Sequence, residues 1–370
     1  METRQSSMED VVKGTLQYIK RVYALELYRM RILVTGHLGY IGTVLVPMLL
    51  ERGHDVVGLD SDLFEDCTFT GAIADVPNIK KDVRDIEEPD LAGFEAVIHL
   101  AGLSNDPLGD YKPELTDAIN YEASVRVARL AKDAGAQRFL FASSCSNYGA
   151  SGDGFLTESA SFNPVTPYGV SKVRVEHALH ELADDSFSPT YLRASTAYGL
   201  SPRIRFDLVT NNLTAWAFTT GSVYLKSDGS PWRPIVHVED IALSYIAALQ
   251  APRELVHNKA FNVGTTSENY QIREIAEIVR QVVPNCEIGF APDAGPDKRC
   301  YRVDCNHIAR TLHDFKPQWT ARRGIEELYQ AYKRVGLALE DFEGERFKRI
   351  SHVQKLVAEG RLGSDLRVLD

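Results

Sequence analysis

The sequence is poor in cysteine and has no apolar run of membrane-spanning length. Its five cysteines form no CxxC pair, and this odd number in a long chain predicts reduced thiols, as in a cytosolic protein, and argues against a metal site. No apolar run approaches the length needed to cross a bilayer, and the N-terminal METRQSSMED lacks the apolar core of a secretory signal. We therefore expect a cytoplasmic protein with no membrane partner.

Positive charge is also in deficit. The formal net charge of −10 argues against a nucleic-acid footprint, which would need a basic patch, so no nucleic-acid partner is expected. The 370 residues, of which 44% are hydrophobic and 25% charged, are typical of a globular protein with one large domain or two lobes. No internal repeat or low-complexity linker divides the chain.

Short apolar segments alternate with helical stretches from residue 31 onward. The segments that predict strands are 31–35, 55–60, 96–100, 138–142 and 190–193. Their near-continuous hydrophobicity predicts burial on both faces, as a parallel sheet requires. Helical segments such as 122–136 lie between them, so the fold class is α/β, with a doubly wound parallel sheet of the Rossmann type.

Glycines mark the turn after the first strand. In TGHLGYIG (35–42), Gly36, Gly39 and Gly42 allow a tight turn, close approach of the backbone to a diphosphate, and close packing of helix on strand. A glycine triplet alone is a weak signal, because any strand–helix turn can use glycine. The preceding strand strengthens it, and so does Asp60, which ends the second strand 18 residues beyond Gly42.

Asp60 bears on which dinucleotide binds. A carboxylate at this position can hold the adenosine ribose and would repel a 2′-phosphate, and no arginine immediately follows, so NAD is favoured over NADP. The alternative is that Asp60 caps a turn. Asp82 and Val83 follow a polar stretch and could flank the adenine; the alternative there is a solvated loop acid.

Tyr168 and Lys172 stand four residues apart, and hence on one face of a helix that begins near Pro167. Alone, this spacing is common, and the alternative is two surface residues. Here it follows Ser144 by 24 residues, and Ser144 ends a predicted central strand. Ligands of open α/β sheets bind outside such strand ends, so the three residues converge where a nicotinamide would lie. There Lys172 would lower the pKa of Tyr168, and Ser144 could hydrogen-bond a reacting hydroxyl.

The motifs as a set resemble those of extended short-chain dehydrogenases/reductases of the nucleotide-sugar epimerase/dehydratase type. The resemblance covers residues 31 to 335. It rests on TGHLGYIG (35–42), Asp60, VIHLAG (97–102), SSCSNYG (143–149), PYGVSK (167–172), PWRPIVHVED (231–240), FNVG (261–264) and DKRCYRVD (297–304). The set is specific for the superfamily and less specific for the substrate.

After about residue 200 the alternation is less regular, which predicts a smaller C-terminal α/β substrate-binding lobe. We expect an NAD-binding Rossmann domain over 31–195, to which the chain returns at about 233–264, and the lobe over 196–232 and 265–335. Apolar residues at helical spacing predict an N-terminal helical extension over 1–30 and a C-terminal helical tail over 336–370.

The resemblance implies NAD as cofactor, a nucleotide-diphosphate sugar as substrate, and a homodimer. The catalytic residues that it implies are Ser144, Tyr168 and Lys172. The cofactor would be bound by Gly36, Gly39, Tyr40, Ile41, Gly42, Asp60, Asp82, Val83, Leu100, Ala101, Gly102, Tyr168 and Lys172. The substrate would be contacted by Ser104, Asn105, Ser144, Cys145, Ser146, Thr196, Asn212, Arg233 and Arg299.

Arg233 and Arg299 match arginines that hold the substrate diphosphate in such enzymes, and a guanidinium suits this because it offers two donors to phosphate oxygens. The alternative for either is a surface ion pair. Asn212 resembles an amide that contacts the diphosphate or sugar, whereas Thr196 departs from the asparagine of many relatives.

Ser104 and Asn105 follow the third core strand and should enter the substrate cleft. A turn built on Asn-Asp-Pro is the alternative there.

The two residues after Ser144 bear on the reaction. Related 4,6-dehydratases place Asp and Glu there, and decarboxylases a glutamate at the second position, whereas this chain has Cys145 and Ser146. A serine without activation is a poor base, so dehydration is disfavoured. Epimerisation at C3 or C5 uses a side-chain base, often with a cysteine at the position of Ser146. Cys145 as an acid/base therefore competes with Cys145 as a buried thiol that fills space.

The sequence thus predicts an NAD-dependent nucleotide-sugar epimerase that acts at C4 through a transient 4-keto sugar and recycles its NAD. The alternatives are C3/C5 epimerisation, a variant dehydration that uses Cys145, and a sugar oxidoreductase that releases NADH. A catalytically silent NAD-sensing scaffold is a further alternative, against which the intact set of Ser144, Tyr168 and Lys172 argues.

Overall fold

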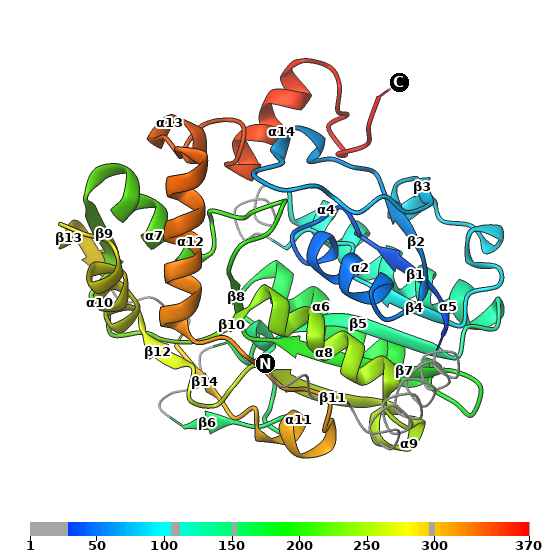
Figure 1. The fold of residues 1–370 in the computed structure, drawn as a ribbon. Coiled ribbons are helices and arrows are strands. Elements are labelled where there is room, and N and C mark those ends of the chain that lie inside the picture. Colours follow the sequence, from blue (N-terminus) through cyan, green and yellow to red (C-terminus); the bar gives the residue numbers. More distant parts are fainter. Residues whose placement is uncertain (1–28, 105–111, 150–153, 296–299, 370) are drawn as a thin grey trace, which may run out of the picture.

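A computed structural model describes residues 29–104, 112–149, 154–295 and 300–369 (Figure 1). All but the last two residues of the expected N-terminal extension lie outside these ranges. Within them, no helix combines the length and the apolar character that crossing a membrane would require.

A seven-stranded parallel sheet forms the centre of the molecule. The strand order is β11-β7-β5-β4-β1-β2-β3, and every neighbouring pair is parallel. The strands are β1 (Arg31–Thr35), β2 (Asp55–Asp60), β3 (Asn78–Lys80), β4 (Ala96–His99), β5 (Arg138–Ser144), β7 (Ser188–Ala194) and β11 (Lys259–Val263). The doubly wound parallel sheet predicted from the sequence is confirmed.

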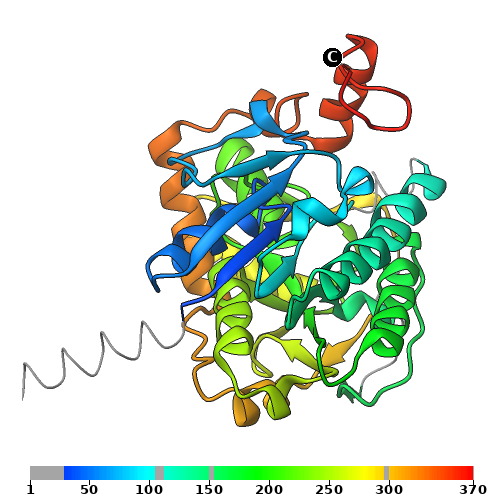
Figure 2. The same cartoon turned by 90° about the vertical axis from the view of Figure 1, so that its right-hand side faces the viewer.

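Helices cover both faces of this sheet (Figures 1 and 2). In β1, Ile32 and Val34 are buried against one hydrophobic core and Leu33 against the other. The first core contains α2 (Gly42–Leu50) and α8 (Val238–Gln250), and the second contains α5 (Ala123–Asp133) and α6 (Pro167–Leu182). Burial on both sides explains why the strand segments are continuously apolar instead of alternating with polar residues.

The order of the strands reverses between β1 and β4. From β1 the chain adds β2 and β3 on one side, and β4, β5, β7 and β11 extend the sheet on the other side. At such a point the connections leave in opposite directions, which opens a crevice at the carboxyl ends of the two strands.

Smaller sheets and further helices lie outside the central sheet, most of them after β7 in the chain. One sheet is formed by β8 (Thr196–Tyr198), β10 (Trp232–His237) and β12 (Asn269–Gln271); β9 (Ser222–Ser227) pairs with β13 (Glu287–Gly295), and β6 (Phe155–Leu156) with β14 (Arg302–Val303). A separate core joins α7 (Val209–Thr220), α10 (Ile272–Val282) and α12 (Ala321–Val335). The shorter helices are α4 (Pro113–Thr116), α9 (Arg253–Val256), α11 (Asn306–Thr311), α13 (Leu339–Phe342) and α14 (Arg349–Ala358).

The sequence predicts that the chain returns to the central sheet at both 235–238 and 260–263, and the first of these predictions is wrong. β11 lies at the edge of the sheet beside β7, but β10 pairs instead with β8 and β12. Because β11 already occupies the free edge of β7, that edge offers no backbone hydrogen bonds to β10.

Candidate active site

A cleft of about 1340 Å³ lies where the strand order predicts it. Its walls come from the turns that follow β1, β2, β4 and β5, from the start of α6, and from β8 and α7 beyond β7. The predicted site residues that line it are Gly36, Gly39, Tyr40, Ile41, Gly42, Asp60, Asp82, Val83, Leu100, Ala101, Gly102, Ser104, Ser144, Ser146, Tyr168, Lys172, Thr196, Asn212 and Arg233. Residues far apart in the chain therefore meet here.

The glycine turn needs its glycines. Gly36 has a φ of 74°, and a Cβ there would lie 2.7 Å from the backbone nitrogen of Ala101. A Cβ on Gly42 would lie 2.5 Å from the carbonyl oxygen of Gly36. The helix that follows, α2, has no acidic residue in its first turn, so no carboxylate competes for the positive end of the helix dipole. This turn can receive the diphosphate of a dinucleotide.

Asp60 ends β2 beside that turn. Its two carboxylate oxygens accept hydrogen bonds from the backbone N–H groups of Leu38 at 3.0 Å and Asp62 at 2.9 Å. A carboxylate accepts about four hydrogen bonds, so capacity remains for ribose hydroxyls. The glycine turn and this carboxylate together fit NAD.

Asp82 lies in the same part of the cleft and forms an ion pair with Arg84 at 2.7 Å. Burial by itself would raise the pKa of Asp82, but the hydrogen bonds from Arg84 outweigh it and hold that pKa below its usual range. Asp82 is therefore an ionised residue in the cleft wall, held in place by Arg84.

Ser144, Tyr168 and Lys172 all line the cleft. Helix α6 begins at Pro167, and the Thr166 hydroxyl caps it by accepting from the Gly169 N–H at 3.1 Å, which sets the first turn that carries Tyr168. The Lys172 Nζ lies 5.4 Å from the centre of the Tyr168 ring and 4.6 Å from that of Phe141.

Lys172 is almost fully enclosed, with 4% of its surface exposed. This burial lowers the pKa of Lys172 to about 7, an effect that the Glu176 carboxylate opposes. Near neutral pH Lys172 therefore exchanges between its ammonium and amine forms, and a nearby negative charge favours the ammonium.

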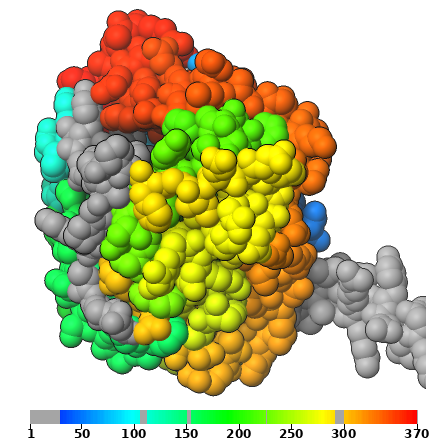
Figure 3. Space-filling view, turned by 90° about the vertical axis from the view of Figure 1, so that its left-hand side faces the viewer, coloured from blue at the N-terminus to red at the C-terminus, as the bar shows by residue number. Residues whose placement is uncertain are grey.

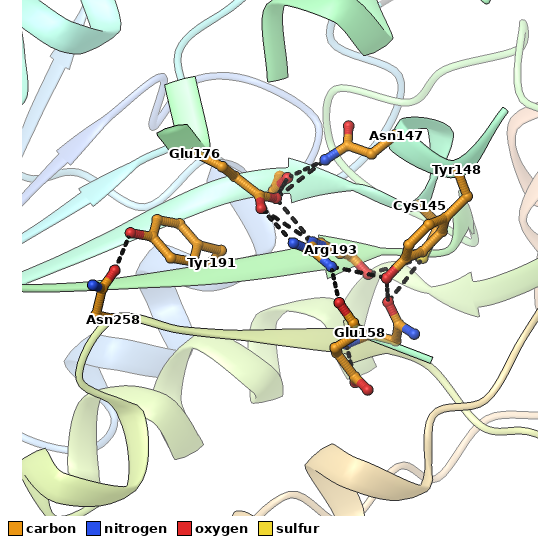
Figure 4. A network of polar contacts seen from close by, with 10 residues as sticks. Cys145, Asn147, Tyr148, Glu158, Glu176, Tyr191, Arg193 and Asn258 are labelled. Carbon is orange, nitrogen blue, oxygen red and sulfur yellow. Dashed lines mark hydrogen bonds and ion pairs between the residues drawn. The ribbon is translucent and has the colours of Figure 1, made fainter. Parts of the chain in front are cut away.

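A buried ion pair connects α6, which carries Tyr168 and Lys172, to β7 (Figure 4). The sequence analysis did not predict it. Arg193 on β7 pairs with Glu176 on α6 at 2.6 Å. The carboxylate of Glu176 also accepts from the Ser143 hydroxyl and, at 3.1 Å, from the Asn147 amide, and Arg193 donates to the Tyr148 hydroxyl at 3.0 Å. The network ties α6, β5 and β7 together. Its only sequence signal is that Glu176 lies one turn beyond Lys172.

Cys145 points away from the cleft. Its side chain is fully buried, and Sγ donates to the Arg193 carbonyl oxygen at 3.1 Å (Figure 4). Burial raises the pKa of the thiol to about 12. The placement of Cys145 among the substrate-contacting residues is therefore corrected: its neighbours Ser144 and Ser146 line the cleft, and Cys145 packs in the core.

Of the remaining predicted substrate contacts, Asn212 and Arg233 line the cleft and two others are not described by the structure. Asn212 donates to the Phe206 carbonyl oxygen at 2.9 Å, and Arg233 is buried with Nη1 donating to the Trp232 carbonyl oxygen at 2.9 Å. Asn105 and Arg299 lie outside the described residues.

Two arginines in the cleft wall were not anticipated. Arg205 is held by Asp207 through two hydrogen bonds of 2.6 and 3.1 Å, and it donates to the Ser104 hydroxyl at 3.0 Å. Arg349 comes from α14 near the C-terminus. No motif marks either of them; the alternation of charge at 203, 205 and 207 is the one available hint.

Across the part of the chain that the structure describes, no group of three or more His, Cys, Asp or Glu side chains is placed to hold a metal ion.

Comparison with known proteins shows similarity over most of the chain. A family profile described as "NAD dependent epimerase/dehydratase family" matches residues 32–264. The chain is 28% identical over 333 residues to a UDP-glucose 4-epimerase of Bacillus subtilis, covering 81% of this chain and 94% of the relative. It is 26% identical over 320 residues to UDP-glucuronic acid decarboxylase 1 of Arabidopsis thaliana, covering 82% and 70%. The solved structure of a Thermus thermophilus UDP-glucose 4-epimerase in complex with NAD has a TM-score of 0.69 at 25% identity, covering 82% of this chain and 99% of that one.

Proposed function

Because the chain belongs to the NAD-dependent epimerase/dehydratase family and uses NAD, we propose that it is a nucleotide-sugar epimerase acting at C4. Relatives of similar identity are named as 4-epimerases and as decarboxylases, so family membership leaves the reaction open. The observation that carries the choice is the wall beside Ser144, where Ser146 faces the cleft and Cys145 is buried in the core.

Dehydration and C3/C5 epimerisation, unlike C4 epimerisation, need a second acid or base near the sugar. Among the described residues, the carboxylates that line the cleft are Asp60, Asp62, Asp82, Asp207 and Glu343, and none of them belongs to the segment that follows Ser144. Asp207 is engaged by Arg205, and the buried Cys145 thiol has a pKa raised to about 12. C4 epimerisation needs no second base, because one group can take and return the hydroxyl proton. This supports the C4 reaction over dehydration and C3/C5 epimerisation.

In this mechanism the protein binds NAD and the nucleotide sugar, orients the reacting hydroxyl, and moves one proton. The backbone of the turn from Gly36 to Gly42 and the carboxylate of Asp60 would hold NAD, which when bound supplies the hydride acceptor. Tyr168 removes the proton of the sugar hydroxyl at C4, and the Ser144 hydroxyl orients that group. The Lys172 ammonium, 5.4 Å from the Tyr168 ring, favours the phenolate form electrostatically.

Inversion at C4 requires the keto sugar to present its other face while its nucleotide stays bound. The side chains of Asn212 and Arg233 lie in the cleft wall and would hold the diphosphate. Tyr168 then returns its proton to the new hydroxyl. Since named relatives act on UDP-glucose and UDP-glucuronic acid, we propose UDP-sugars as the first substrates to examine.

The test is to incubate the purified protein with UDP-, GDP-, CDP-, dTDP- and ADP-sugars in D2O and to identify the products by NMR and mass spectrometry. A new C4 epimer without solvent deuterium supports the proposal. Deuterium at C3 or C5, loss of water or CO2, or accumulation of NADH would each overturn it in favour of the corresponding reaction. An unchanged panel with NAD bound would favour a sensing scaffold.

A further inference from the structure

The C-terminal segment, residues 339–369, forms part of the wall of the cofactor cleft although it lies beyond the family match, which ends at residue 264. Its residues Phe347, Arg349, Ile350 and Leu366 line the same cleft as Asp60. Figure 3 shows this segment (orange to red) covering the top of one face of the molecule beside α7 (green). The segment therefore lies where it would contact a dinucleotide that binds in the cleft.

One side of the segment is attached to the loop that follows Asp60. The Arg346 carbonyl oxygen accepts from the Cys67 thiol at 2.8 Å, and the Arg346 guanidinium donates to the Thr68 carbonyl oxygen at 2.9 Å. The Arg349 guanidinium lies over the Phe64 ring at 3.9 Å. These contacts fix the segment over the loop beside the expected ribose site.

The end of the segment is attached to the loop that contains Asp82. Arg84, which also holds Asp82, donates to the Asp365 carbonyl oxygen at 2.9 Å, and Arg367 forms an ion pair with Asp85. Leu366 packs in the core that contains Val83. The expected adenine site is therefore bounded by the same segment.

The other side of the segment is attached to the region of α7. The Phe347 ring lies 5.5 Å from the Phe206 ring, and the Phe342 ring 5.3 Å from the Trp216 ring. The Arg349 Nη2 donates to the Arg203 carbonyl oxygen at 3.4 Å. The segment thus bridges the two sides of the cleft, and a dinucleotide lying on the glycine turn would be enclosed beneath it.

Three arginines gather at this bridge, and two of them are paired with carboxylates. Arg203, Arg205 and Arg349 lie close together, whereas the carboxylates among them are Asp62, paired with Arg203 at 3.0 Å, and Asp207, paired with Arg205 at 2.6 Å.

Arg349 is the arginine of this cluster for which the described residues provide no paired carboxylate. Its Nε is buried and has no hydrogen-bond partner among the described residues, and the same holds for Nε and Nη1 of Arg203, which is 3% exposed. Burial, together with the neighbouring Arg205, lowers the pKa of Arg349 to about 10. An anion in the cleft beside Arg349 would supply the counter-charge that this guanidinium lacks among the described residues.

We propose that residues 339–369 are a strap that retains NAD in the cleft, and that Arg349 binds the NAD diphosphate. The diphosphate is the anionic group of NAD, and Arg349 lies over Phe64 in the loop that continues from Asp60. The inference rests on the proposed function only through the recycling of NAD: a cofactor that accepts and returns a hydride in one turnover must not leave between the two steps.

The test compares Arg349→Met with Arg361→Met as a matched control. Both arginines belong to the strap, but Arg361 lies outside the cleft, has a side chain 55% exposed, and pairs with Asp66 and Glu359 at 3.5 Å. We expect Arg349→Met to release NAD about 10- to 100-fold faster than the wild type, measured by exchange of bound NAD for isotopically labelled NAD. The control should release it at the wild-type rate, and Arg349→Lys should be intermediate.

Wild-type NAD exchange in a folded Arg349→Met protein would overturn the proposal. So would unchanged NAD exchange combined with weaker binding of UDP, since Arg349 would then serve the diphosphate of the sugar nucleotide. Should the variants fail to fold, hydrogen exchange of the wild type decides: NAD must slow exchange over 342–366, and no change would contradict the strap. None of these readouts needs a sugar substrate, so failure of the proposed epimerase reaction would leave them intact.

Discussion

The two walls of the cleft are built in different ways. One wall carries the glycine turn, Ser144, Tyr168 and Lys172, and each of its parts is a short sequence motif at a strand end or a helix start. The opposite wall carries Arg205 and the strap with Arg349, which are positioned by ion pairs and aromatic contacts between distant segments. The residues proposed for chemistry lie on the wall of local motifs, and those proposed to enclose NAD lie on the wall of long-range contacts.

The largest expected effect comes from breaking the motif wall at one atom. Tyr168→Phe removes the hydroxyl that takes the sugar proton and leaves the strap intact. We expect turnover to fall about 10³-fold, within the usual range for loss of a general base, while the purified protein keeps its NAD. Product NMR and HPLC of released NAD measure the two quantities. Turnover within tenfold of the wild type would remove Tyr168 from the mechanism.

The buried network beneath the motif wall is tested by Glu176→Gln. This change leaves the Arg193 guanidinium buried without its counter-charge, so we expect the free energy of unfolding to fall by about 3 to 5 kcal/mol. Glu181→Gln, at an exposed position of the same helix, is the matched control and should stay within about 0.5 kcal/mol of the wild type. Urea unfolding measures both. A loss below about 1 kcal/mol would mean that the network does not fix this wall.

The pH dependence of stability tests whether water is excluded from the interior of the sheet around His99. His99 on β4 is 1% exposed, and burial lowers its pKa from 6.5 to about 3. The unfolded chain therefore takes up the proton first, so the stability that His99 contributes is present above pH 6.5 and is lost as the pH falls toward 3. Between pH 7.5 and 5.0 the wild type should lose about 2 kcal/mol more stability than His99→Gln. Equal losses would show that His99 titrates normally.

The smallest effect is expected from Cys145→Ala. Cys145 and Ser146 follow Ser144 directly, but only Ser146 lines the cleft, and Cys145 packs in the core. Because the thiol packs in the core, turnover should stay within about twofold while stability falls by about 1 kcal/mol. A loss of turnover comparable to that of Tyr168→Phe would restore Cys145 as an acid/base and would favour C3/C5 chemistry.

The same contrast explains what could be predicted from the sequence. The parallel sheet was predictable because strands buried on both faces, such as β1 and β5, are continuously apolar. The position of Ser144, Tyr168 and Lys172 in one cleft was predictable because a strand end and a four-residue helical spacing each have a local signature.

The features that the sequence analysis predicted wrongly or did not predict also share a physical cause. β10 is as apolar as a strand of the central sheet, and only the occupied edge of β7 decides its partner. The pairing of Glu176 with Arg193 and the placement of Arg349 depend on which segments meet in space, and neither has a periodic pattern in the sequence. A tail helix was expected, but its position across the cleft was not.

The most direct test of the central claim follows the hydride. The nucleotide sugar that turns over would be prepared with deuterium at C4 and converted in H2O, with the product examined by NMR and mass spectrometry. We expect an inverted C4 that keeps its deuterium, because the hydride leaves and returns within one closed cleft. Loss of the label to solvent, or its appearance in released NADH, would contradict epimerisation at C4.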